Sequence, residues 1–248
     1  MALISLEDLD GLEDEQLDDE ITDNPEPMEE VEGERLFNHW QAVASTHQVS
    51  VPQEMTGPIQ EMTRRNHQRE QIHSVLINRH EKMGEVLYEE RVYPAGNWAC
   101  VTKEAELYEQ SISLGFMKLM RFICKENSAG RHLGMTIPVM NNIHITEDGK
   151  TFEKHVLTAF YLPAEFQSTP PQPVDPDITI VYRDPFRVIA RPFFGTTTEE
   201  TITHQINQLW EILGDVDSLH RDRYMVAVYE NPGVSCRRNE IWFIRREP

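Results

Sequence analysis

Four side chains between residues 117 and 124 have types and spacing suited to holding a ligand. Met117, Met120 and Cys124 lie along one side of an expected helix, with Arg121 at the edge of that side. Thioether and thiol groups are soft and polarisable, so they pack well on a flat apolar molecule whose acidic edge the guanidinium would meet. Methionine at helical spacing is, however, more often part of a core. The residues alone leave a ligand groove and additional core packing as alternatives.

Two helices must position these groups, and both carry a regular apolar stripe. The first is predicted over residues 107–125 from apolar side chains spaced i, i+4, i+7 and i+11, namely Ile112, Phe116, Leu119 and Ile123. The second is predicted over residues 196–214, where the same spacing recurs in Ile202, Ile206, Leu209 and Leu213. Trp210 takes the position in the second helix that Met120 takes in the first. The two helices therefore share one sequence pattern.

Strand candidates flank both helices in the same order. One strand candidate precedes each helix and two follow it. The first helix lies after residues 88–101 and before 135–145 and 155–162. The second helix lies after residues 178–194 and before 223–230 and 240–246. Internal repetition on this scale is evidence about the whole fold. The prediction is an α+β fold in which a duplicated strand–helix–strand–strand unit forms a distorted antiparallel β-barrel flanked by two α-helices.

The charge of the chain is concentrated at one end. Residues 1–34 contain fifteen of the 42 acidic residues and no Lys or Arg, so the remainder is close to neutral. A surface without basic excess does not favour nucleic acid as a partner. Apolar runs stay well short of the roughly 20 residues that a membrane span needs, and the start lacks a secretory signal. Three scattered cysteines fit reduced thiols, so a cytoplasmic protein is expected.

Three segments are expected along the chain. Residues 1–34 form an acidic tail, expected to be disordered, whose interspersed leucines either only keep it soluble or dock on a protein partner. Residues 35–86 form a helical N-terminal extension, with helical patterns in 35–45 and again in 58–85. Residues 87–247 form the main domain, in which Asp148 and Gly149 predict a hairpin turn.

Several segments together resemble the SOUL/haem-binding protein family. They are YEERVYPAGNWACV, GRHLGMTIPVM, FQSTPPQP and RRNEIWFIRRE, and the resemblance covers roughly residues 86–247. It implies a distorted antiparallel barrel with two flanking helices, and non-covalent binding of haem or other tetrapyrroles in the cytosol without established catalysis.

The resemblance also implies a site beside helix 107–125. There Met120 would touch the porphyrin face and Arg121 would meet the propionates. The expected lining is completed by Met117, Cys124, His132, Met135 and Trp210. Two departures stand out: Val92 occupies the position where some members carry a proposed axial histidine, and the loop at 231–236 lacks a lysine that some members place over the groove. No metal site is expected, and His132 and Cys124 are the nearby groups that could replace the missing iron ligand.

Two other functions remain open from the sequence. The acidic tail would suit a protein-interaction module. A small-molecule hydrolase on a related fold would need a perturbed acid or phenol in the pocket, for which Glu109, Tyr161 and Tyr229 qualify by type alone. Because the sequence shows no nucleophile elbow, phosphate loop or metal-ligand cluster, a binding protein is expected rather than an enzyme.

Overall fold

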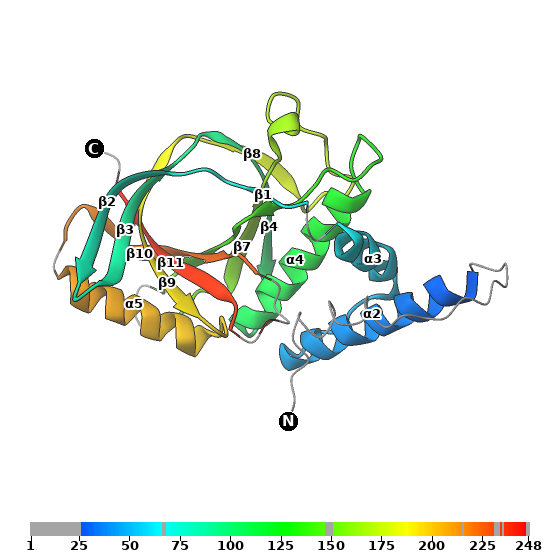
Figure 1. Cartoon of the computed structure of the whole chain (residues 1–248), viewed down its shortest axis with the longest axis horizontal. Helices are drawn as coiled ribbons and strands as arrows, with labels where there is room; N and C mark the ends of the chain where they lie inside the picture. The colour runs from blue at the N-terminus through cyan, green and yellow to red at the C-terminus, as the bar shows by residue number, and fades with distance from the viewer. Residues whose placement is uncertain are drawn as a thin grey trace.

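The structure is a computed structural model that describes residues 26–65, 68–146, 151–214, 216–230, 234 and 236–246. A large curved sheet carries two helices on its outer face, and the N-terminal helices lie beside the first of them (Figure 1). The expected tail lies outside the described residues up to position 25. Its last part, residues 26–34, was expected to be disordered and is instead the start of a helix. The hairpin turn expected at Asp148 and Gly149 also lies outside them.

The main sheet has nine strands, and each of its pairs is antiparallel. The strands are β2 (Val75–Lys82), β3 (Glu85–Tyr93), β4 (Gly96–Glu104), β6 (Val139–His144), β7 (His155–Tyr161), β8 (Thr179–Arg183), β9 (Phe186–Phe194), β10 (Leu219–Val228) and β11 (Arg238–Arg245). Their order is β2-β3-β9-β11-β10-β6-β7-β4-β8. Separately, β1 (Glu70–Gln71) pairs in parallel with β5 (Thr136–Ile137). The α+β class is confirmed, but the expected closed barrel is wrong because β2 and β8 are free edges.

One long ribbon explains why the sheet looks barrel-like without closing. Tyr93 of β3 lies opposite Phe186 of β9, and Gly96 of β4 lies opposite Arg183 of β8, so the two pairings share one register. Between them, Pro94–Ala95 faces Asp184–Pro185, and prolines lack the N–H that a ladder needs. The ribbon bends there and arches from one end of the sheet to the other (Figure 1). The curvature therefore comes from two broken strands and not from hydrogen-bonded closure.

The two faces of the sheet have different partners. Alternate residues of β3, β4, β10 and β11 form an aromatic-rich cluster under the arch, which includes Trp98, Trp242 and Tyr93. The rings of Tyr93 and Trp242 lie 4.2 Å apart between centroids. The opposite face packs against helices α4 (Tyr108–Cys124) and α5 (Glu199–Leu213). The interior of the arch is thus filled by side chains, and the helices lie outside it.

The strands expected over 88–101 and 178–194 are each two strands in the structure, β3 with β4 and β8 with β9, so the predicted duplicated strand–helix–strand–strand unit is not confirmed. Thr198 caps α5 by accepting a hydrogen bond from the backbone N–H of Thr201, and Gly214 ends the helix with a φ of 70°. The range of 196–214 expected from the sequence lies within about three residues of both ends. No helix in the described part of the chain is long and apolar enough to cross a membrane.

The N-terminal extension is less helical than expected. It contains α2 (Glu26–Thr46), the short 3-10 turn η1 (Gln53–Met55) and α3 (Thr56–Arg64). The helix expected over 58–85 ends at Arg64, and residues 75–82 form the edge strand β2 instead. Met83 and Gly84 both have positive φ, which suits the tight turn that pairs β2 with β3. The turn was not predicted because its first position holds a methionine, which is not one of the residues typical of such turns.

Candidate ligand-binding face of helix α4

Helix α4 is buried on the side that lies against β4 and β7. Ser111, Gly115, Leu119 and Phe122 are buried there at helical spacing. The helix comes so close that a Cβ on Gly115 would lie 2.7 Å from Oγ1 of Thr158. The residues that face the sheet therefore differ from the apolar stripe predicted from the sequence. The small Ser and Gly side chains face the sheet because they let the helix approach it most closely. Phe116, one of the predicted stripe residues, lies beside this side of the helix, where its ring meets that of Phe160 in β7 edge-on with centroids 5.6 Å apart.

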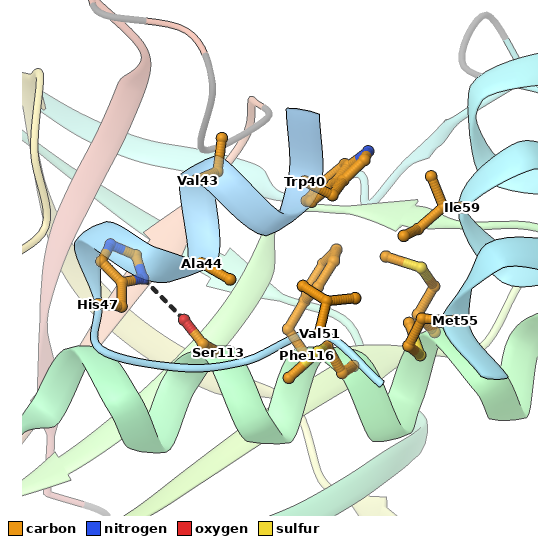
Figure 2. A pocket seen from close by; sticks show the side chains of 11 residues that line it. Trp40, Val43, Ala44, His47, Val51, Met55, Ile59, Ser113 and Phe116 are labelled. Atoms are coloured by element: carbon orange, nitrogen blue, oxygen red, sulfur yellow. Dashed lines mark hydrogen bonds between the residues drawn. The ribbon is translucent and has the colours of Figure 1, made fainter. Parts of the chain in front are cut away.

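Phe116 and the methionines of α4 face the N-terminal extension. Figure 2 shows Trp40 of α2 beside Phe116, with Val51, Met55 and Ile59 completing the contact. The Trp40 and Phe116 rings are nearly parallel, with centroids 6.4 Å apart and an interplanar angle of 14°. Met55 and Met120 are each only 1% exposed. The soft side of α4 is thus covered by residues of the same chain.

A small apolar cavity remains between α4 and the extension. It measures about 40 Å³ and is lined by Trp40, Val43, Ala44, His47, Val51, Met55, Ile59, Ser113, Phe116, Met117 and Met120. Pockets that hold cofactors or drug-sized ligands usually have volumes of about 300–1,000 Å³. The covered face therefore has the apolar lining of a binding site without the room for a large ligand.

His47 is the main polar group in the cavity wall. Its Nδ1 lies 2.7 Å from Oγ of Ser113 on α4 (Figure 2). Burial lowers the pKa of His47 and the charge of Arg237 lowers it further, while Glu109 acts in the opposite direction. The imidazole is therefore neutral at neutral pH. Because the pattern of α2 alone does not show what it packs against, sequence reasoning gave His47 no role.

Arg121 lies at the rim of this face, engaged by two carboxylates. Its Nε donates to Oε1 of Glu126 over 2.8 Å, and its Nη1 lies 3.5 Å from Oε2 of Glu54 in η1. The hydrogen bond to Glu126 raises the pKa of Arg121, and both carboxylates contribute through their charge. The guanidinium therefore stays charged at the edge of the face, where an acidic ligand group would compete with these two carboxylates.

Cys124 and His132 lie near the end of α3. Sγ of Cys124 is 3.7 Å from the backbone oxygen of Pro58, and burial raises the pKa of the thiol to about 12. The group is thus a protonated thiol and a poor iron ligand. Burial and the nearby charge of Arg65 lower the pKa of His132. Its buried Nδ1 has no hydrogen-bond partner among the described residues.

The seven residues expected at the site fall into two places. Met120, Cys124 and Met135 belong to one buried cluster, with Met117 packed against it; Arg121 and His132 lie at its edges. Trp210 lies apart, on α5, where its Nε1–H donates to the hydroxyl of Tyr224 over 3.0 Å. Of the seven, Met117 and Met120 line the cavity, and Trp210 packs in a separate cluster.

The two departures noted in the sequence occupy other parts of the domain. Val92 is in β3, between Val75 of β2 and Arg187 of β9, whereas α4 packs on β4 and β7. The loop at 231–236 lies mostly outside the described residues. Within the described ranges, His, Cys, Asp and Glu side chains form no group of three or more that could hold a metal ion.

Comparisons with known proteins point to one family. A model described as SOUL heme-binding protein matches residues 70–244. Heme-binding protein 1 of Xenopus laevis is 30% identical over 171 residues, covering 68% of this chain and 89% of that protein. Heme-binding protein 2 of Homo sapiens is 29% identical over 161 residues, covering 64% and 78%. A hydrolase structure from Listeria innocua has a TM-score of 0.37 at 10% identity over 75% of this chain and 96% of that one, too low to carry an argument.

Proposed function

Since this chain belongs to the SOUL heme-binding protein family, we propose that it binds haem or another tetrapyrrole non-covalently along α4. The observation that carries the proposal is the second apolar side of this helix. A helix packed on a sheet needs only one buried side, yet α4 also presents Met117 and Met120 away from the sheet. Phe116 lies between the two sides, in contact with Phe160 of β7 and with the extension. Together these three side chains of α4 offer a flat aromatic and thioether surface suited to a porphyrin face.

Arg121 would orient the ligand by meeting a propionate at the rim. A hydrogen bond to a charged group contributes roughly 1.5–3 kcal/mol, and the partial exposure of this side chain reduces that figure. Apolar burial supplies about 25 cal/mol per Å², so most of the affinity would come from the helix face itself. Micromolar binding is the expected range.

The iron would have no ligand from the first strand. Val92 has no lone pair to offer, and the thiol of Cys124 is held protonated by burial. Haemin and iron-free protoporphyrin should therefore bind with similar affinity, since the contacts depend on the ring and its propionates. We further propose a binding role without catalysis, because the relatives are described by what they bind. A cytosolic location is proposed because three scattered cysteines fit reduced thiols.

The test is an absorbance titration of the full chain with haemin and with protoporphyrin. Saturable one-to-one binding of both supports the proposal. Arg121→Ala should weaken binding tenfold or less without unfolding the domain. Arg246→Ala, which removes an exposed charge at the far end of the chain, is the matched control. A loss of stability as large as a core deletion in Arg121→Ala would make Arg121 structural and remove it from the site.

A ligand preference would also be informative. Binding of haemin alone would contradict the metal-independent site and point to an iron ligand. A six-coordinate low-spin ferric spectrum that disappears in His132→Ala would identify that ligand as His132. A spectrum unchanged in that variant would exclude it.

A further inference from the structure

The extension that covers α4 lies outside the part of the chain that matches the family. The match begins at residue 70, whereas α2, η1 and α3 end at Arg64. Met55 and Ile59 of this segment are almost fully buried, at 1% and 2% exposure, in the same cluster as Met120. The segment is therefore a well-packed addition to the family domain, placed on the face that the ligand would use.

The extension offers α4 the same chemistry as a tetrapyrrole. The indole of Trp40 lies nearly parallel to the ring of Phe116, as a flat apolar ligand would. The carboxylate of Glu54 lies 3.5 Å from Nη1 of Arg121, where a propionate would be expected. An aromatic surface and an acidic edge thus meet the two features of α4 that the proposed ligand needs.

The space between the two surfaces excludes simultaneous occupancy. The cavity of about 40 Å³ is far smaller than the roughly 300–1,000 Å³ that ligand pockets typically have. A macrocycle lying on Phe116 and Met120 would overlap Trp40 and Met55, which line the same cavity from the other side. The ligand and the docked extension therefore compete for one surface.

The extension can leave this surface without dismantling the sheet. The strand ladders begin at Glu70, where β1 pairs with β5, so no ladder uses a residue of α2, η1 or α3. Its polar contacts with α4 include His47 with Ser113, Glu54 with Arg121 and the Pro58 carbonyl with Cys124, so single polar pairs and not a network accompany the apolar contact. Release would therefore cost mainly apolar burial, which a bound tetrapyrrole restores on the α4 side.

We propose that residues 33–65 form an intramolecular plug that occupies the tetrapyrrole face of α4 and must be displaced before the ligand binds. This inference rests on the proposed function and adds its regulation. The plug lowers the apparent affinity because only the open state binds the ligand. The size of the reduction is set by the ratio of the docked to the open population. Any change that loosens the plug tightens ligand binding.

Hydrogen exchange on the full chain, with and without haemin, tests the displacement directly. Saturating haemin should slow amide exchange in residues 112–124 and accelerate it in residues 40–64, because one surface is exchanged for another. Slower exchange in both segments would overturn the plug, since the extension would then be a second wall of the site. Unchanged exchange in 40–64 despite saturable binding would overturn it as well.

A loosened variant of the full chain provides the second test. Trp40→Ala removes the ring that lies on Phe116 and should tighten haemin and protoporphyrin binding by about tenfold. Asn38→Ala, at an exposed position of the same helix, should leave both affinities unchanged. Weaker binding in Trp40→Ala, or loss of a low-spin spectrum in His47→Ala, would show that the extension holds the ligand and would overturn the plug.

These outcomes separate the plug from the proposed function. Equal saturable binding by the wild type and Trp40→Ala keeps the tetrapyrrole site and rejects the plug. Binding by Trp40→Ala with little or none by the wild type supports both. Binding by neither, with the sheet folded in thermal unfolding, rejects the tetrapyrrole site and the plug together.

Discussion

Helices α4 and α5 lie on the same face of one sheet, yet they are buried to different extents. In α5 the buried residues are Ile202, Ile206 and Leu209, a single stripe towards the sheet. In α4 the buried set also includes Met120 and Cys124, on the side away from the sheet. The difference arises because the extension packs on α4, whereas α5 keeps its outer side partly exposed.

Met120 and Trp210, which hold equivalent positions in the two sequence stripes, show what this difference means. Met120 is 1% exposed under α2 and η1. Trp210 is partly buried, with the guanidinium of Arg221 over its ring at 4.6 Å and Phe243 at 4.8 Å between ring centroids. A helical pattern thus reveals which sides can be buried, but not what covers them.

The largest expected effect comes from the contact that sets α4 on the sheet. Gly115→Val would force a side chain against Thr158, whose hydroxyl donates to Oδ1 of Asn141 over 2.9 Å in the core. Overpacking and a disturbed buried hydrogen bond should together cost about 4 kcal/mol of unfolding free energy. Asn207→Val, at an exposed position of α5, should stay within about 0.5 kcal/mol. Denaturant unfolding measures both, and similar values would contradict the close approach of α4.

This contact also shows where sequence reading reaches its limit. The apolar spacing located both helices to within a few residues, since burial on a sheet imposes it. It read β3 with β4, and β8 with β9, as single strands. It misplaced the sheet-facing side of α4, because Ser111 and Gly115 carry no apolar signal. It also missed β2, a fully exposed edge strand. The local sequence pattern thus predicted the helices well. It predicted poorly an exposed strand and a helix side formed by small residues.

The candidate site divides in the same way. Met117, Met120 and Arg121 could be predicted as neighbours because they share one helix, so their spacing fixes their geometry. Trp40, His47 and Met55 lie more than fifty residues earlier, and their contact with α4 depends on tertiary packing alone. Trp210 was grouped with Met120 by analogy between two helices, although they pack in separate clusters.

Met55→Ala should break the covering of α4 while leaving α5 and the sheet intact. Removing a fully buried methionine costs about 2–5 kcal/mol where the site cannot collapse. We expect this loss in the docking of the extension, so amide exchange should accelerate in residues 40–64 and stay slow in β10 and β11. Met83→Ala, where the methionine is 96% exposed, is the control. Equal acceleration throughout the sheet would show that the extension and domain unfold as one unit.

The same substitution on the two helical layers should have opposite consequences. Trp210→Ala deletes the hydrogen bond to Tyr224 and the contact with Phe243, which should lower unfolding free energy by about 2 kcal/mol because the ring is only partly buried. Its tetrapyrrole affinity should remain within about twofold of wild type. Trp40→Ala should instead change affinity and spare the sheet. A tenfold loss of affinity in Trp210→Ala would return Trp210 to the site.

The smallest effect should appear on changing pH, through the histidines beside the extension. Burial lowers the pKa of both His47 and His132, with Arg237 and Arg65 respectively adding to the shift. A histidine whose pKa in the docked state is below its ordinary value of 6.5 binds a proton more readily once the extension is released. Docking is therefore at full stability above pH 6.5 and weakens as the pH falls below that value.

Exchange in residues 40–64, corrected for its intrinsic pH dependence, should therefore accelerate between pH 7.5 and 5.5, while α5 shows no matching change. His47→Gln keeps a polar group near Ser113 but cannot gain the proton, so it should reduce the response. If that variant responds like the wild type and His132→Gln does not, the pH dependence belongs to the contact with α3. If exchange in the wild type does not change with pH, docking of the extension alters the pKa of neither imidazole. The covering of α4 would then be insensitive to pH.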